Sequence, residues 1–163
     1  MRFGLMFMPE PVAAMKRVHD ALRPGGHAVV ATWGPPAKNP WAALVIAALK
    51  QHMDIPAPPP NATGLFAFAD PDRQRSTLAE AGFVDVKIEE VANEIGSFVD
   101  GASYCDFIFT LSGPLADLLD KLPLDKQAQV KREVASEMTS RYTRDNRLAI
   151  PGSAWVATAT RQR

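Results

Sequence analysis

The stretch LRPGGHAVVATW, residues 22–33, decides the fold of this chain. Pro24 and the pair Gly25 and Gly26 are typical of the end of a helix, and residues 28–33 are apolar apart from Thr32. A short strand that is apolar on both faces is typical of the middle of a parallel sheet. Helix, tight turn and buried strand in close succession form the second half of a β-α-β unit. The first strand of that unit is expected before Arg2.

The residues before this stretch predict a helix over 11–22. Val12, Met15, Val18 and Leu22 recur at steps of three or four residues, as on one face of an amphipathic helix. A proline suits the first turn, and Pro11 stands there. Residues 3–8 are strongly apolar and form either a short strand over 3–7 or coil.

The middle of the chain alternates helix and loop signals. An alanine-rich helix is predicted over 40–53, and the proline run 56–60 indicates a loop or a hinge. Asp70 followed by Pro71 is a strong helix start. Residues 83–91 alternate with period two, which predicts a strand with one wet face or a place near a sheet edge.

The last third of the chain predicts three helices and a strand. Gly113 and Pro114 divide residues 98–122 into two helices, and residues 125–142 form a long polar helix with a narrow apolar stripe. Residues 147–152 are expected to be a loop. The β-branched stretch 154–160 predicts the final strand.

Composition excludes several classes of protein. The 163 residues carry 18 basic and 18 acidic side chains and are 47% hydrophobic, which fits one globular domain without the basic surface that nucleic acid requires. The longest apolar run, residues 41–49, is far shorter than the roughly 20 residues of a membrane-spanning helix. One cysteine, Cys105, three scattered histidines and no signal-peptide core predict a cytoplasmic protein without a metal site.

Three motifs in order carry a family resemblance: RFGLMFM at 2–8, LRPGG at 22–26 and EAGF at 80–83. They resemble the C-terminal half of class I S-adenosylmethionine-dependent methyltransferases, in the small-molecule branch related to ubiquinone and menaquinone biosynthesis. The resemblance implies an α/β fold, half of a Rossmann-like sheet, with about three strands and five or six helices. It also implies that the last strand lies between the other two and antiparallel to both.

The same resemblance implies one truncated domain over 1–163, in which residues 98–142 form a helical, lid-like insertion. In the family, the methyl donor S-adenosylmethionine sits on a glycine-rich turn after the first strand. No G-x-G spacing occurs among the ten glycines of this chain. The donor-binding half is therefore expected to be missing, and the chain is expected to be inactive alone.

Five residues are candidates for ligand binding by resemblance. Arg2 and Phe3 match positions that border the donor, with a frayed terminus as the alternative. Trp33, at the carboxyl end of the buried strand, and Tyr104 and Phe107, in the lid-like segment, match the acceptor side, with core packing as the alternative. No catalytic residue is predicted, because methyl transfer is an in-line displacement that rests mostly on orientation.

Two functions remain open from the sequence. In the first, the chain is the acceptor side of a methyltransferase for a small molecule, and another polypeptide supplies the donor site. In the second, it is a non-catalytic, self-associating module derived from a methyltransferase. A strand with two apolar faces at a sheet edge needs cover, so a homodimer or larger homo-oligomer is expected, with residues 3–8 buried between chains.

Overall fold

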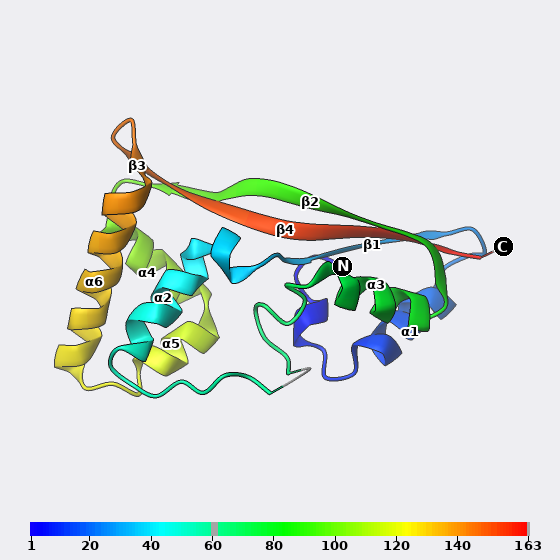
Figure 1. Ribbon diagram of the computed structural model, residues 1–163, viewed down its shortest axis with the longest axis horizontal. Coiled ribbons are helices and arrows are strands. Elements are labelled where there is room, and N and C mark those ends of the chain that lie inside the picture. The colour runs from blue at the N-terminus through cyan, green and yellow to red at the C-terminus, as the bar shows by residue number, and fades with distance from the viewer. Residues whose placement is uncertain (60–61, 163) are drawn as a thin grey trace. The chain divides into compact units, whose positions relative to one another are not determined.

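The computed structural model describes residues 1–59 and 62–162, and Figure 1 shows the arrangement of the elements. Residues 60 and 61, at the end of the proline run, and residue 163 lie outside the described residues. The helices are α1 (Pro11–Ala21), α2 (Pro40–Lys50), α3 (Pro71–Glu80), α4 (Gly101–Leu111), α5 (Gly113–Leu119) and α6 (Leu124–Tyr142), with short 3-10 turns η1 (Leu5–Phe7) and η2 (Pro36–Lys38). The strands are β1 (His27–Trp33), β2 (Phe83–Phe98), β3 (Thr143–Arg144) and β4 (Arg147–Arg161).

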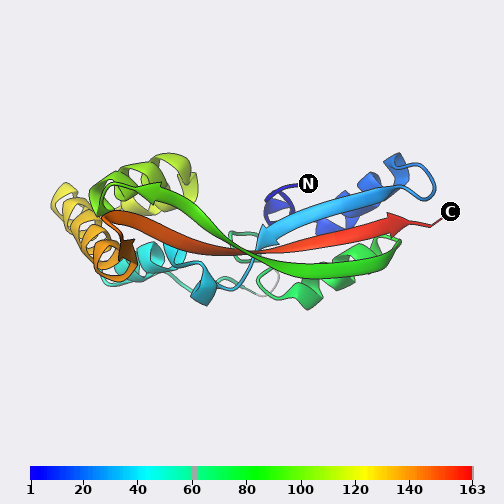
Figure 2. The same ribbon diagram turned by 90° about the horizontal axis from the view of Figure 1, so that it is seen from above.

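The sheet has the order β1-β4-β2, with the short β3 paired to β4. Strand β4 runs antiparallel to β1, with Val30 opposite Ala157 and Trp33 opposite Ala154. Figure 2 shows β4 between its two neighbours and running against both. The predicted central, antiparallel position of the last strand is confirmed, and β2 lies at a sheet edge, as its period-two pattern indicated.

The chain forms two compact units. Unit 1 consists of Met1–Lys38, Pro58–Ala92 and Ser153–Arg163, and unit 2 consists of Asn39–Ala57 and Asn93–Gly152. Strands β2 and β4 each contribute residues to both units. Each unit is described separately below.

Unit 1 has its core on one face of the sheet. Val30 and Ala157 meet Met15 of α1 and Leu78 of α3 there, and all four side chains are buried. Helices α1 and α3 lie on this face in Figure 1. On the other face Val29 is 52% exposed, so the expectation that β1 is buried on both faces is wrong within the described residues. The physical reason is that this part of the sheet has helices on one side.

The N-terminal segment does not form the strand that was one alternative for residues 3–7, and residues 3 and 4 have no regular secondary structure, as the coil alternative predicts. Its second half is the 3-10 turn η1, in which Leu5 and Met6 are buried in the core of unit 1. Phe7 and Met8, at and after the end of this turn, are exposed. The apolar opening of the chain therefore fills the core of its own unit at two positions.

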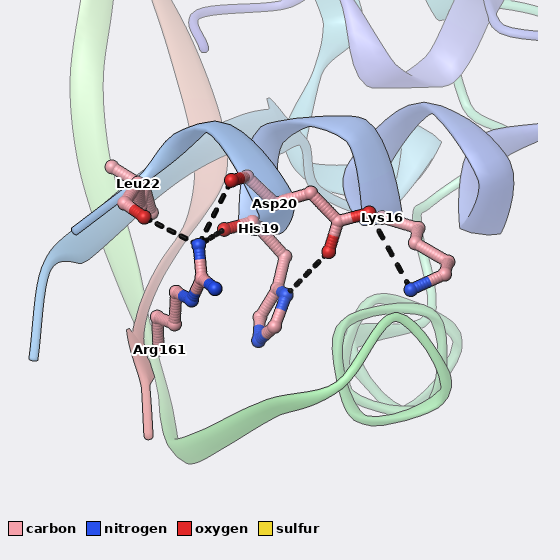
Figure 3. A network of polar contacts seen from close by, with 5 residues as sticks. All are labelled: Lys16, His19, Asp20, Leu22 and Arg161. Carbon is pink, nitrogen blue, oxygen red and sulfur yellow. Dashed lines mark hydrogen bonds and ion pairs between the residues drawn. The ribbon is translucent and has the colours of Figure 1, made fainter. Parts of the chain in front are cut away.

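The C-terminal end of α1 is closed by an arginine from the last strand, as Figure 3 shows. The Arg161 guanidinium donates from Nη1 to the carbonyl oxygens of His19 and Asp20, at 3.1 and 2.8 Å, and to that of Leu22 at 2.5 Å. These are among the carbonyls that the end of a helix leaves without partners. The Asp20 carboxylate lies 3.1 Å from Nδ1 of His19, and this contact holds the pKa of Asp20 below its ordinary value. Arg161 thus joins α1 to β4.

Helix α3 begins where the sequence predicts. The Asp70 carboxylate accepts a hydrogen bond from the backbone N–H of Asp72 at 2.9 Å, and Pro71 occupies the first helical position. An N-cap of this kind contributes about 1 kcal/mol to helix stability.

Strand β4 begins earlier than predicted, because a tight hairpin replaces the expected loop over 147–152. Asp145 and Asn146 have φ angles of 49° and 59°, which are the left-handed values that a two-residue hairpin turn requires. Thr143 then pairs with Leu148, and Arg144 pairs with Arg147. Asp and Asn tolerate this conformation better than most residues do, so the pair Asp145-Asn146 was the sequence signal for the hairpin.

Unit 2 is built on α6, which packs against α2 and α4. The predicted break at Gly113 is confirmed by the separation of α4 from α5. A Cβ on Gly101 would lie 2.1 Å from the carbonyl oxygen of Ala135, so only glycine allows α4 to start this close to α6. Within the part of the chain that the structure describes, no helix is long and apolar enough to cross a membrane.

Candidate functional site

The carboxyl end of β1 carries two aromatic rings in face-to-face contact. Phe3 stacks on Trp33 with ring centroids 4.0 Å apart and an angle of 17° between the ring planes. Both rings are partly buried and pack against the core of unit 1. Aromatic pairs of this kind contribute about 0.5–1.5 kcal/mol beyond the area that they bury. In open α/β sheets, ligands bind outside the carboxyl ends of strands, and the stacked pair occupies such a place.

Backbone pairing at the edge of β1 holds Phe3 in this position. The amino terminus of Met1 donates to the Val29 carbonyl at 2.6 Å, and the Ala31 N–H donates to the Met1 carbonyl at 2.9 Å. The Phe3 N–H donates to the Ala31 carbonyl at 2.9 Å, and Arg2 forms a parallel bridge with Ala31. The first three residues therefore cover part of the β1 edge from within the chain. Arg2 and Phe3 are therefore paired with β1, and the alternative of a frayed terminus does not hold.

Arg2 is exposed beside the stacked pair. Its side chain has no hydrogen-bond or ion-pair partner among residues 1–59 and 62–162, so its guanidinium is available to a ligand. Phe3 has a φ angle of 54°, a left-handed value that is uncommon for a bulky residue. Such backbone conformations persist where surrounding contacts hold them, and the pairing with Ala31 and the stack on Trp33 supply those contacts. The structure brings together three of the five predicted site residues: Arg2, Phe3 and Trp33.

A carboxylate with two partners lies just beyond this strand end. Lys38 donates from Nζ to both oxygens of Glu90, at 2.8 and 2.7 Å, and the Ser153 hydroxyl donates to Oε1 of Glu90 at 2.7 Å. The hydrogen bond from Lys38, followed by that from Ser153, lowers the pKa of Glu90. Glu90 is therefore a fixed anion and not a proton acceptor ready for catalysis.

Gly34 permits the approach of Ser153 to this cluster. The Gly34 N–H donates to the Ser153 carbonyl at 2.9 Å, and a Cβ on Gly34 would lie 2.7 Å from the Ser153 hydroxyl oxygen. A side chain at this position would displace the hydroxyl that holds Glu90. This cluster could not be predicted from local sequence patterns, because Lys38 and Ser153 are 52 and 63 residues from Glu90.

Two buried oxygens lie behind the same strand end. The hydroxyl of Thr32 and the side-chain carbonyl of Gln74 have no hydrogen-bond partner among the described residues. The Gln74 amide donates to the Val30 carbonyl at 3.1 Å, so its side chain is anchored to β1. Thr32 belongs to β1, the strand that carries Trp33, and Gln74 belongs to α3, so both oxygens lie within unit 1.

The other two predicted site residues lie in unit 2. Tyr104 is fully buried, its hydroxyl donates to the carbonyl of Trp41, and its ring meets the edge of Phe98 with centroids 5.4 Å apart. Burial raises the pKa of Tyr104 well above its ordinary value. Phe107 also contacts Phe98, with centroids 5.2 Å apart, and is 37% exposed. Of these two rings, Phe107 is the one open to a ligand.

The arrangement supplies contacts for binding, and its carboxylate, Glu90, is already held by Lys38 and Ser153. Cys105 is buried, and desolvation raises its pKa to about 11, which suits a core residue and not a nucleophile. No group of three or more His, Cys, Asp or Glu side chains among the described residues has the geometry of a metal site. The aromatic rings of Phe3 and Trp33 and the guanidinium of Arg2 at the carboxyl end of β1 can orient a ligand.

Comparison with known proteins identifies the fold. No protein-family model matches the chain, and no curated protein sequence matches it. Among solved structures, a protein named as a methyltransferase from Bacillus halodurans C-125 aligns with a TM-score of 0.51 and 16% identity, over 99% of this chain and 68% of the other.

Two further structures are of phosphoethanolamine N-methyltransferase 2 from Haemonchus contortus. One is in complex with phosphomonomethylethanolamine and S-adenosylhomocysteine, and the other with S-adenosyl-L-methionine. Their TM-scores are 0.44 and 0.42, at 11% and 12% identity, and the chain spans only 32% of the length of each. The alignment with the Bacillus halodurans protein, together with the strand order β1-β4-β2, shows that this chain has a methyltransferase-like α/β fold.

Proposed function

We propose that these 163 residues form the acceptor side of a class I S-adenosylmethionine-dependent methyltransferase that acts on a small molecule. The observation that carries the proposal is the position of β4, antiparallel between β1 and β2, which is the arrangement that the family resemblance implies. The stacked rings of Phe3 and Trp33 support it, because they lie at the strand end where such sheets bind ligands.

The residues of this chain do not by themselves fit the methyl donor. A glycine-rich turn lets the backbone approach such a ligand, and a carboxylate accepts hydrogen bonds from its ribose hydroxyls. No G-x-G spacing is available for the first role. We therefore propose that the donor site is completed by residues outside this chain and that the chain alone is inactive.

Isothermal titration calorimetry with S-adenosylhomocysteine and the purified chain tests the proposal. We expect no saturable heat of binding at micromolar concentrations of protein. Micromolar affinity would contradict the claim that the donor site needs other residues. A Trp33→Ala variant serves as the control for any heat observed, because binding at the β1 end would be weakened by loss of the stacked ring.

A second candidate function is a non-catalytic module that self-associates. The observation that favours it is a set of exposed apolar side chains in unit 1: Phe7 is 46% exposed, Met8 is 38% exposed and Val29 is 52% exposed. Leu5 and Met6 already lie in the core of unit 1, so an interface between chains would use Phe7 and Met8, or the open sheet face at Val29, and not the whole of residues 3–8. Light scattering that gives a mass near 17.7 kDa would contradict self-association.

A further inference from the structure

Unit 2 contains a groove between α2 and α6 that is separate from the residues discussed so far. Its volume is about 630 Å³, within the range of roughly 300–1,000 Å³ that small-molecule sites occupy. Helix α2 contributes Leu44, Ala47 and Ala48, Gln51 follows directly after that helix, and α6 lines the other side between Arg132 and Arg141.

Small apolar side chains keep the groove open. Ala47 and Ala48 of α2 lie in the lining where longer side chains would fill the space, and Leu44 and Val134 add apolar surface. Val134 and Ala48 are buried, so they form a floor, whereas Ala47 is exposed. A ligand in this groove therefore needs an apolar body.

The two carboxylates of the groove already have partners. One oxygen of Glu133 lies 3.0 Å from Nε2 of His52, and the other accepts a hydrogen bond from the Gln129 amide at 2.9 Å. The contact with His52 is the main cause of the lowered pKa of Glu133. Glu137 forms an ion pair with Arg141. Both carboxylates therefore have partners, and a cationic ligand would have to displace one of these partners.

Arg141 is paired with Glu137, but three other hydrogen-bond donors of the groove have no side-chain partner among the described residues. The guanidinium of Arg132 and the hydroxyl of Ser136 lie one helical turn apart on α6, so they point to the same side of that helix. Together with the side-chain amide of Gln51, directly after α2, they have no partner among residues 1–59 and 62–162. An arginine guanidinium presents a planar set of donors that matches a carboxylate.

We propose that the α2/α6 groove of unit 2 binds a small organic anion, a carboxylate on an apolar body. The carboxylate takes the donors of Arg132 and Ser136, and the apolar body lies against Leu44 and Ala47 of α2. This site is independent of the proposed methyl transfer, because it needs neither the donor nor the β1 end.

Calorimetry on the full chain tests this proposal with 4-phenylbutyrate as the probe and 4-phenylbutanol as its uncharged match. We expect saturable binding of the carboxylate at one site and binding of the alcohol that is about tenfold weaker, since one charged hydrogen bond is lost. Amide chemical shifts in nuclear magnetic resonance spectra should change in residues 44–51 and 132–141. Equal binding of acid and alcohol, no saturable binding, or shift changes elsewhere would each overturn the proposal.

Three variants locate the site further. Arg132→Gln should weaken binding of 4-phenylbutyrate about tenfold and leave binding of the alcohol unchanged. Ala47→Trp should block both probes, and because Ala47 is exposed, this change leaves the core intact. Lys121→Gln removes an exposed positive charge of unit 2 outside the groove and should change nothing. An equal effect of Arg132→Gln and Lys121→Gln would mean that net charge, not the groove, attracts the anion. Circular dichroism verifies that each variant is folded.

Discussion

At the scale of single residues, the buried hydroxyl of Tyr104 is the clearest test of how unit 2 is held together. It donates to the carbonyl of Trp41 and so joins α4 to α2 in the buried interior of unit 2. Tyr104→Phe should lower the free energy of unfolding by about 1 kcal/mol, the usual net contribution of one hydrogen bond. Denaturant titration measures this loss.

The matched control is Tyr142→Phe, because the Tyr142 hydroxyl has no partner among the described residues. That variant should unfold at the same denaturant concentration as the wild type. Equal effects of the two substitutions on the free energy of unfolding would contradict the hydrogen bond between the Tyr104 hydroxyl and the Trp41 carbonyl.

Cys105 provides a second test at this scale. Its pKa is raised by burial from an ordinary 9.0 to about 11, so at pH 8 the thiolate is about a hundredfold scarcer than in an exposed cysteine. Ellman's reagent should therefore react with the folded chain far more slowly than with the chain in denaturant. Equal rates in the two states would contradict the burial of Cys105.

The ion pair of Glu90 with Lys38 makes the stability of unit 1 depend on pH. Because Lys38 and Ser153 stabilise the charged carboxylate, the folded pKa lies below the ordinary value of 4.5. The stabilisation is complete above pH 4.5 and is lost as the pH falls through the lower folded value. The difference in stability between the wild type and Glu90→Gln should therefore shrink on acidification. Glu89→Gln, an exposed neighbour, should show no such difference at any pH.

The candidate site was predictable only in part at the residue scale. The family resemblance pointed to Arg2, Phe3 and Trp33, and the structure brings these residues together at one strand end. The resemblance did not distinguish Tyr104, whose hydroxyl is hydrogen-bonded to Trp41 in the interior of unit 2, from Phe107, whose side chain is partly exposed. Burial depends on which helices pack against α4, and periodicity along α4 alone does not reveal those neighbours.

At the scale of elements, the hairpin of β3 and β4 shows where local patterns are insufficient. The apolar stretch 154–160 predicted a strand, but its extension back to Arg147 depends on two left-handed residues and on pairing with Thr143 and Arg144. Helices were predicted more accurately. The start of α3 and the break between α4 and α5 each depend on residues adjacent in sequence, such as Asp70 with Pro71.

Substitution at the hairpin turn tests this account. Asn146 has a φ angle of 59°, a conformation that costs a β-branched residue about 1–2 kcal/mol. Asn146→Val should therefore lower the free energy of unfolding by about that amount, and Asn146→Gly should leave it unchanged or raise it slightly. Thermal denaturation of the two variants measures the difference. Equal midpoints would mean that the turn does not have the left-handed backbone described here.

At the scale of the whole chain, the order of the strands carries both the fold and the proposed function. Strand β1 has the apolar sequence of a central strand, yet in this chain its free edge is partly covered by residues 1–3 and Val29 is exposed. An apolar pattern indicates that a strand can be buried on both faces. Whether both faces are in fact buried depends on which helices and strands of the chain pack against it. For this reason the position of β4 was predictable from the resemblance, and the open face of β1 was not.

Disulfide trapping of β4 against β1 tests the central claim most directly. Val29 lies opposite Thr158, and directly opposed residues of an antiparallel pair lie within the Cα separation that a disulfide bridges. In a Cys105→Ala background, the pair Val29→Cys and Thr158→Cys should oxidise within one chain, as mass spectrometry would show. The pair Val29→Cys and Val156→Cys, two residues out of register, should not. Preferential oxidation of the second pair, or no intrachain disulfide in the first, would contradict the arrangement β1-β4-β2 on which this account of the protein rests.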